Sequence, residues 1–153
     1  MGTASKRLTI SGILAVSAVA LFIACCGAQP AAAATPQQRY TVFFDFNSIA
    51  VRPSAAQVIA RAAATAKERQ AQHSLSHVKV IGYADAAGSA AASQRLSEQR
   101  AAVVRDALTA QGVPAESIAV EGRGRRDPAV STADRVREAR NRRVRIVLYG
   151  PGE

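Results

Sequence analysis

The amino-acid sequence predicts an α/β fold, an α+β two-layer sandwich with a small mixed four-stranded sheet, two long helices and one short helix. Short runs of aromatic and β-branched residues alternate with alanine-rich runs of helical periodicity, in the order β-α-β-α-β-α-β. Helices between strands require crossover connections, so part of the sheet is expected to be parallel. Right-handed crossovers then place both long helices on one face of the sheet.

The first half of the domain is predicted to contain two strands and one long helix. The first strand is expected at 40–46, where the residues are aromatic and β-branched. After a short loop, Pro53 suits the first turn of a helix that ends near Arg69 and carries one apolar stripe. The second strand is expected at 78–83, and a turn follows it at 85–89.

The second half of the domain begins with another long helix. Apolar residues recur at helical spacing up to about Gln111, and Gly112 followed by Pro114 is a common way for a helix to end. The remaining predicted elements are a short strand, a loop rich in Gly, Arg and Pro, a short polar helix and a last strand, in that order: 117–121, 122–130, 133–140 and 144–149.

The N-terminal segment has the residue order of an export signal. Lys6 and Arg7 precede an uncharged apolar run of 17 residues at 8–24, and small residues follow. Three outcomes are open for this segment. The sequence FIAC, which ends at Cys25, resembles a lipobox and would make that cysteine the lipidated residue; Ala-Ala-Ala at 32–34 would serve ordinary cleavage; and an uncleaved run would remain as a membrane anchor.

The chain therefore divides into four predicted regions. The signal peptide, lipoprotein signal or anchor covers 1–28, and a flexible tether rich in Ala, Pro and Gln covers 29–38. One folded domain covers 39–149, and 150–153 form a tail. A domain of this length is long enough to build one modest hydrophobic core.

The residue types argue against metal, redox and catalytic sites. Cys25 and Cys26, the only cysteines, both lie in the targeting segment, so the domain is expected to have no disulfide. His73 and His77 are read as surface loop residues rather than metal ligands. The sequence shows no nucleophile elbow, phosphate-binding loop or HExxH motif. We therefore expect a protein that is not an enzyme and has no cofactor.

The charge of the chain favours an anionic neighbour. The formal net charge is +9, and a basic balance suits nucleic acid, a membrane surface or a wall polymer. Export and the scarcity of aromatic residues argue against nucleic acid. Arg123, Arg125 and Arg126 precede a second arginine cluster at 135–145. These arginines are either a solvated face or a basic rim that attracts wall carboxylates or anionic lipid.

One constellation suggests a ligand site. Asp85 lies just past the carboxyl end of a predicted strand, where open α/β sheets place their ligands, and Gly88 allows the chain to turn. Arg100, on the following helix, is expected to lean back toward the Asp85 loop. A carboxylate and a guanidinium facing one cleft suit a zwitterionic ligand. The alternative is an ordinary structural ion pair between Asp85 and Arg100, which the spacing alone favours.

Six short motifs occur in order along residues 40–148. They are FDFNS with Pro53, GYAD with Gly88-Ser89, Leu96-Ser97 with Arg100-Ala101, Gly112-Val113-Pro114, GxG at 122–124 with Pro128, and NRRV at 141–144. Together they resemble the OmpA-like (OmpA/MotB C-terminal) peptidoglycan-binding domain, as in the peptidoglycan-associated lipoprotein. The resemblance covers nearly the whole predicted domain.

The resemblance implies a role for each matched position. Asp85 would bind the ammonium group of meso-diaminopimelate in the peptide stem, and Arg100 would bind its carboxylate. Arg142 would border the same groove, as would Asn47 in the loop after the first strand. Ser93 stands where the family usually has asparagine, so its hydroxyl would reach the ligand less easily.

The resemblance also implies a function and a location. The expected function is non-covalent, non-catalytic binding of peptidoglycan, which anchors the outer membrane or envelope to the cell wall. The alternative is an envelope scaffold whose main partner is another protein. The expected place is the cell envelope of a Gram-negative bacterium, on the periplasmic side of the outer membrane, with the N-terminal lipid or anchor in the membrane.

Overall fold

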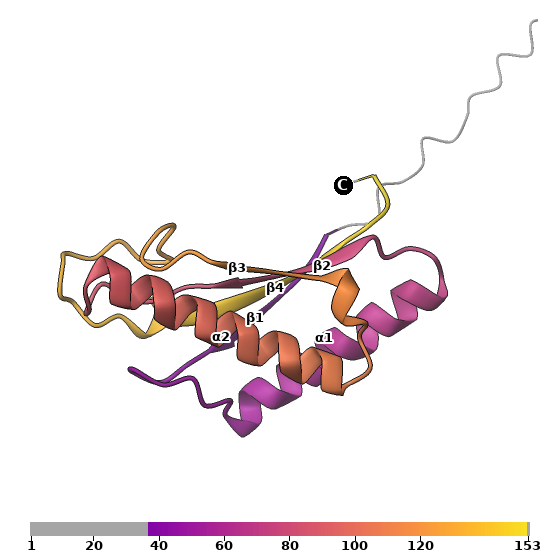
Figure 1. Cartoon of the computed structure of the whole chain (residues 1–153), viewed down its shortest axis with the longest axis horizontal. Coiled ribbons are helices and arrows are strands. Elements are labelled where there is room, and N and C mark those ends of the chain that lie inside the picture. Colours follow the sequence, from indigo (N-terminus) through magenta and orange to yellow (C-terminus); the bar gives the residue numbers. More distant parts are fainter. Residues whose placement is uncertain (1–36, 153) are drawn as a thin grey trace, which may run out of the picture. The chain divides into compact units, whose positions relative to one another are not determined.

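The computed structural model describes residues 37–152, and Figure 1 shows their arrangement. The elements are β1 (Gln38–Phe43), α1 (Pro53–Ala71), β2 (His77–Gly82), α2 (Ala90–Ala110), β3 (Ile118–Gly122) and β4 (Arg143–Tyr149), with short 3-10 turns at Ala115–Ser117 and Ala139–Asn141. The predicted α/β class is confirmed. The predictions for the targeting segment at 1–28, for Cys25 and for most of the tether lie outside the described residues.

The four strands form one mixed sheet in the order β1-β4-β2-β3. β4 is antiparallel to both of its neighbours, whereas β2 and β3 are parallel. Both long helices lie on the same face of this sheet, as right-handed crossovers require (Figure 1). The carboxyl ends of β2 and β3 therefore open side by side, which is where an open sheet of this kind places a ligand.

The core lies between the helices and the sheet. The strands contribute mainly branched aliphatic side chains, α1 contributes several alanines, and α2 contributes both kinds. Small side chains on α1 let the helix backbone pack close to the sheet. The fully enclosed members with less than 2% exposure include Val42, Ile59, Ala62, Val78, Val80, Val104, Leu108, Val144, Ile146 and Leu148.

The ends of both long helices follow the predicted signals. Pro53 begins α1. Ser89 caps α2, because its side chain accepts a hydrogen bond of 3.2 Å from the backbone N–H of Ala92. The chain leaves α2 through Gly112, whose φ of +90° is a conformation that suits glycine. Among residues 37–152, no helix is both long and apolar enough to cross a bilayer.

The predicted short helix at 133–140 is wrong. Most of this segment is irregular, and a single 3-10 turn at Ala139–Asn141 is its only helical part. Arg135 has a φ of +65°, which interrupts a right-handed helix, and the largely exposed segment has no apolar stripe that a helix could bury. The segment is instead part of a long loop between β3 and β4.

The first strand lies earlier in the chain than predicted, at Gln38–Phe43 rather than at 40–46, so it includes the last residue of the predicted tether. It ends at Phe43, although the N–H of Phe44 still donates to the carbonyl of Arg142 at 2.9 Å. Asn47 then adopts a positive φ of 49°, which asparagine tolerates better than most residues. The chain therefore leaves the sheet early, and residues 44–52 form a loop beside the carboxyl end of β2.

Gly82, at the end of β2, allows α2 to lie directly on the sheet. A Cβ atom at this position would lie 1.9 Å from the backbone oxygen of Ser97. No side chain fits there. The first turns of α2 are thus held close to the ends of β2 and β3, and the loop that contains Asp85 is enclosed between α2 and the loop after β1.

Candidate functional site

Asp85 lies in the loop between β2 and α2, and this loop forms one wall of a small pocket. The pocket has a volume of about 110 Å³, and Asn47, Asp85 and Ser93 line it. Its other lining residues come from the same three segments: Phe46, Ala84, Ala87, Gly88, Ala92 and Leu96. We call this cavity the Asp85 pocket. It contains three of the five residues that the sequence suggested as ligand-binding.

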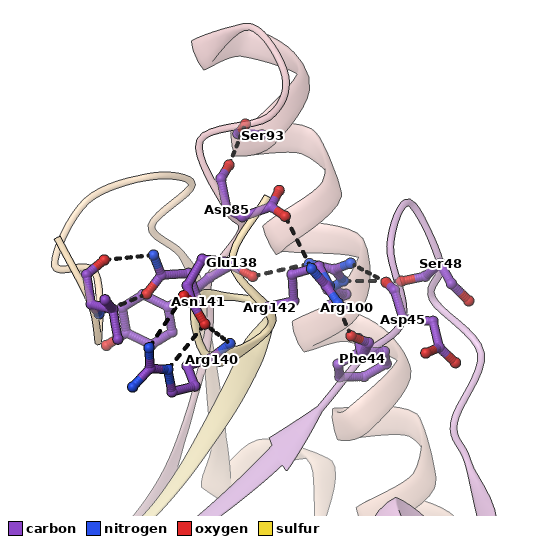
Figure 2. Close-up of polar contacts among 12 residues, drawn as sticks. Phe44, Asp45, Ser48, Asp85, Ser93, Arg100, Glu138, Arg140, Asn141 and Arg142 are labelled. Atoms are coloured by element: carbon purple, nitrogen blue, oxygen red, sulfur yellow. Dashed lines mark hydrogen bonds and ion pairs between the residues drawn. The ribbon is translucent and has the colours of Figure 1, made fainter. Parts of the chain in front are cut away.

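Arg142 is the ion-pair partner of Asp85. Its Nη1 atom lies 3.3 Å from Oδ2 of the carboxylate, and its Nε donates to the carbonyl of Phe44 at 3.2 Å (Figure 2). The side chain of Arg142 is 15% exposed and that of Asp85 is 7% exposed. The spacing favoured a structural ion pair between Asp85 and Arg100. The structure instead pairs Asp85 with Arg142.

Arg100 lies behind the pocket and is 0% exposed. Its guanidinium donates to three backbone carbonyls. Nε donates to Ser48 at 3.0 Å and Nη2 to Asp45 at 2.9 Å (Figure 2). Nη1 donates to Tyr83 at 3.2 Å. Burial lowers the pKa of Arg100 to about 10, against the opposing effect of Asp85, so the side chain remains cationic at neutral pH. Arg100 thus connects the loop after β1 to the end of β2.

Ser93 and Asn47 flank the carboxylate from two different elements. Ser93, in the first turn of α2, is 4% exposed, and its Oγ donates to the backbone carbonyl of Asp85 over a long 3.4 Å. Asn47 is exposed in the loop after β1. The pocket therefore has a charged floor and two neutral polar groups on its walls.

Sequence reasoning gave no role to a second set of residues that fixes the Asp85 loop. The Oγ of Ser97 accepts from the N–H of Gly124 at 2.8 Å and donates to the carbonyl of Gln94 at 2.7 Å. The carbonyl of Gly124 then accepts from the N–H of Ala84 at 2.8 Å. Ser97 thus acts through Gly124 on the residue next to Asp85. Its place in the Leu96-Ser97 motif was the available signal.

Asn141 is another positioning residue that the sequence did not single out for a role. Its side-chain oxygen accepts from the N–H of Val130 at 2.9 Å, and its Nδ2 donates to the carbonyl of Val130 at 2.8 Å. Asn141 is 2% exposed. This two-bond clasp holds the long loop after β3 against the start of β4, one residue before Arg142.

The histidines lie away from the pocket. His77 was expected in a surface loop, but it begins β2 and stacks on Tyr149 with the ring centres 4.4 Å apart. His73 follows α1 with a φ of +53°. Within residues 37–152 there is no group of three His, Cys, Asp or Glu side chains that could hold a metal.

Comparison with known proteins identifies the family of this chain. The model of the OmpA family matches residues 43–142, which is more than half of the 153-residue chain. The chain belongs to the OmpA family. The matched segment of this OmpA-family chain contains the whole Asp85 pocket and ends at Arg142.

Individual relatives agree with the family assignment. The chain is 38% identical over 107 residues to probable lipoprotein YiaD of Escherichia coli (strain K12), covering 70% of this chain and 47% of that protein. The chain spans about half the length of the curated relatives it matches.

Two solved structures resemble the domain at 27% sequence identity. The peptidoglycan-associated lipoprotein from Burkholderia pseudomallei superposes with a TM-score of 0.63, covering 71% of this chain and 89% of that one. The cell wall anchor of the T6SS from Pseudomonas aeruginosa gives a TM-score of 0.60, covering 74% and 82%. The OmpA-family fold is therefore shared with proteins whose names refer to the cell wall.

Proposed function

We propose that this chain binds peptidoglycan non-covalently and without catalysis, and so anchors the outer membrane or envelope to the cell wall. The ligand group is meso-diaminopimelate of the peptide stem, whose side-chain end carries an ammonium and a carboxylate. The observation that carries the proposal is the Asp85 pocket, where a nearly buried carboxylate lies 3.3 Å from the guanidinium of Arg142. The two solved relatives named for peptidoglycan association and wall anchoring support it.

The ammonium group of the ligand binds Asp85. The carboxylate lines the pocket, and its salt bridge to Arg142 uses Oδ2, so Oδ1 is the natural acceptor for a ligand N–H. Low exposure of this carboxylate reduces the competition from water, which strengthens a charge-assisted hydrogen bond. A neutral donor would give Asp85 only a weaker hydrogen bond and an anion would give it none, so the pocket favours a cation.

The carboxylate of the ligand binds the arginines. Neither arginine lines the Asp85 pocket itself, and Arg142, which is 15% exposed against 0% for Arg100, makes the first contact from beside it. Arg100 has five N–H donors and uses three on backbone carbonyls, so two remain for a ligand oxygen. The carbonyls of Asp45 and Ser48 accept from its guanidinium, so a direct contact between Arg100 and the ligand requires this loop to move.

The neutral polar residues orient the ligand. Ser93 bonds only weakly to the backbone of Asp85, so its hydroxyl is able to exchange that bond for one to the ligand. Asn47, which lines the pocket from the loop after β1, supplies an amide to the peptide backbone of the stem. The short reach of Ser93 lowers affinity but does not change which ligand is recognised.

The N-terminal segment and the relatives support the proposed location. The export signal directs the chain out of the cytoplasm, and lipidation at Cys25 would place it at the periplasmic face of the outer membrane. Relatives named as lipoprotein and outer membrane proteins support an envelope role. The domain acts as a binding module there, with no enzymatic step, no cofactor and no nucleic-acid partner.

The test is a pull-down of the purified protein with sacculi that contain diaminopimelate. Asp85→Ala is expected to reduce the bound fraction strongly, whereas Asp106→Ala, at an exposed aspartate on α2, serves as the matched control. Sacculi with lysine in place of diaminopimelate lack the second carboxylate and should bind weakly. Equal binding by Asp85→Ala and the unaltered protein would overturn the proposal.

A second candidate function is that of an envelope scaffold whose main partner is a protein. Phe43, Phe46 and Ile49, at the end of β1 and in the loop after it, are 51%, 45% and 43% exposed. Exposed apolar side chains close together in the chain favour a protein contact. In-cell crosslinking through these positions that captures no envelope protein would count against the scaffold role.

A further inference from the structure

A second and larger pocket lies on the other side of the turn that carries Asp85. It has a volume of about 450 Å³ and is lined by Ala84 and Ala86 of the turn, by Arg123, Arg125 and Arg126 of the loop after β3, and by Asp134. We call it the arginine pocket. Ala84 lines both cavities, whereas Asp85 lines the first and Ala86 the second. One turn of chain therefore separates an acidic pocket from a basic one.

The three arginines of this pocket differ in how fully their charge is compensated. Arg123 pairs with Glu121 at 2.7 Å and also with Asp127, so it is fully engaged. Arg126 donates only over long distances to two backbone carbonyls, 3.3 Å to that of Arg123 and 3.5 Å to that of Gly122. Carbonyl contacts of this length leave the positive charge of Arg126 available to an anion.

Arg125, the third arginine of the pocket, already forms an ion pair with a carboxylate. Nη1 of Arg125 lies 3.0 Å from Oδ1 of Asp134, whose side chain is 84% exposed. An ion pair with so exposed a partner is weak, so an incoming oxyanion can compete for Arg125 at small cost. The guanidinium fork of arginine matches the two oxygens of a carboxylate or phosphate. Because Asp134 already supplies a carboxylate to Arg125, the arginine pocket is suited to a carboxylate or a similar oxyanion.

We propose that Arg125 and Arg126 form a second binding site for an oxyanion, and that its occupant is the free carboxylate of the glutamate that precedes diaminopimelate in the peptide stem. The choice of this occupant rests on the proposed function, in which the diaminopimelate of the same peptide binds in the Asp85 pocket. The shared turn places an anion site beside a zwitterion site, and adjacent residues of one stem carry those two kinds of charge. The same oxyanion chemistry is also found in the phosphate of an anionic lipid headgroup.

The experiment measures calorimetric binding of the full chain in detergent to two synthetic tripeptides. One is L-Ala-γ-D-Glu-meso-diaminopimelate, and the other carries an amide in place of the glutamate carboxylate. Amidation is expected to lower the affinity about tenfold, the usual effect of one charge-assisted hydrogen bond. Arg126→Gln should lower the affinity for the free acid by a similar factor and leave that for the amide unchanged, whereas Arg61→Gln, at an exposed arginine on α1, should change neither.

A second variant predicts a change in the opposite direction. Asp134→Asn removes the internal competitor for Arg125, so affinity for the free-acid tripeptide should rise about two- to threefold. A variant that merely disturbed the loop would bind more weakly. Equal affinities of the unaltered protein for the two tripeptides would overturn the glutamate site, as would a loss of affinity in Asp134→Asn.

The outcomes separate the two proposals and the two sources of the anion. If neither tripeptide binds, the proposed function fails and the glutamate occupant fails with it. If both bind equally, the function stands and the glutamate occupant fails. Glycerol phosphate is the probe for the lipid source. If it binds the unaltered protein but not Arg126→Gln, and the two tripeptides bind with equal affinity, the occupant of the arginine pocket is a lipid headgroup rather than the peptide stem.

Discussion

Oδ2 of Asp85 and Nη1 of Arg142 lie 3.3 Å apart, although the two residues are separated by 57 positions in the chain. The pair joins the loop after β2 to the residue that precedes β4. Both side chains are mostly buried, and removing one partner of a buried pair leaves the other charge uncompensated. A ligand with an ammonium and a carboxylate offers each of them a new partner, so this pair is the centre of the candidate site.

Arg142→Gln should weaken ligand binding and also destabilise the domain. The free energy of unfolding is expected to fall by about 1–3 kcal/mol, because Asp85 loses its cation and the carbonyl of Phe44 loses a donor. Affinity for the tripeptide should fall about tenfold or more. Calorimetry and urea unfolding measure the two effects, and Arg140→Gln, whose arginine pairs with Glu138, is the control. Unchanged affinity would remove Arg142 from the site.

Arg100→Met should destabilise the domain more than the loss of any exposed arginine. The substitution keeps an apolar stem beside Phe44 but leaves three backbone carbonyls without their donor. We expect the free energy of unfolding to fall by about 3–5 kcal/mol, measured by urea denaturation. Arg105→Met, at an exposed position on the same helix, should change it by less than about 0.5 kcal/mol. Similar losses for the two variants would contradict the bonding described for Arg100.

The architecture was predictable because strands and long helices leave periodic patterns. The runs at 78–83 and 144–149 alternate or are continuously apolar, and Pro53, Gly112 and Pro114 mark helix ends, so both long helices and all four strands were found. The segment 133–140, predicted as a short polar helix, is the exception. Propensity alone does not form a helix where no apolar face is buried, and tertiary contacts decided that segment.

The candidate site was only partly predictable. The position of Asp85 after a strand marked it as a candidate. Side-chain direction on the helix pointed Arg100 toward the same end of the sheet, where its Nη1 donates to the carbonyl of Tyr83, but Arg100 does not line the Asp85 pocket. The sequence carries no signal for burial of a guanidinium among backbone carbonyls, because such bonds depend on the path of the loop after β1. The ion-pair partner of Asp85 was also unpredictable. Arg142 lies next to Asp85 only because β4 lies beside β2 in the sheet.

Ser97→Ala should increase the mobility of the Asp85 loop, although Ser97 acts on that loop only through Gly124. The substitution leaves the buried N–H of Gly124 without an acceptor, at a cost of about 1–3 kcal/mol in the free energy of unfolding. The amides of Gly124 and Ala84 should exchange with deuterium faster than in the unaltered protein under native conditions. Ser117→Ala, which removes one bond to the carbonyl of Pro114, should leave these two amides unaffected. Unaltered exchange in Ser97→Ala would show that the serine does not position Asp85.

Glu121 should make part of the stability dependent on acid pH. Its hydrogen bonds with Arg123 and Lys79 lower the pKa of the carboxyl to about 2 in the folded protein, against about 4.5 when unfolded. A depressed folded pKa contributes stability above the unfolded value and loses it as the pH falls from about 4.5 toward 2. Because the side chain is 33% exposed, solvent screening limits the effect to about 1 kcal/mol. Urea denaturation at pH 5 and pH 3 should show a smaller decrease in Glu121→Gln than in the unaltered protein, and an equal decrease in both would show that other carboxylates account for the acid sensitivity.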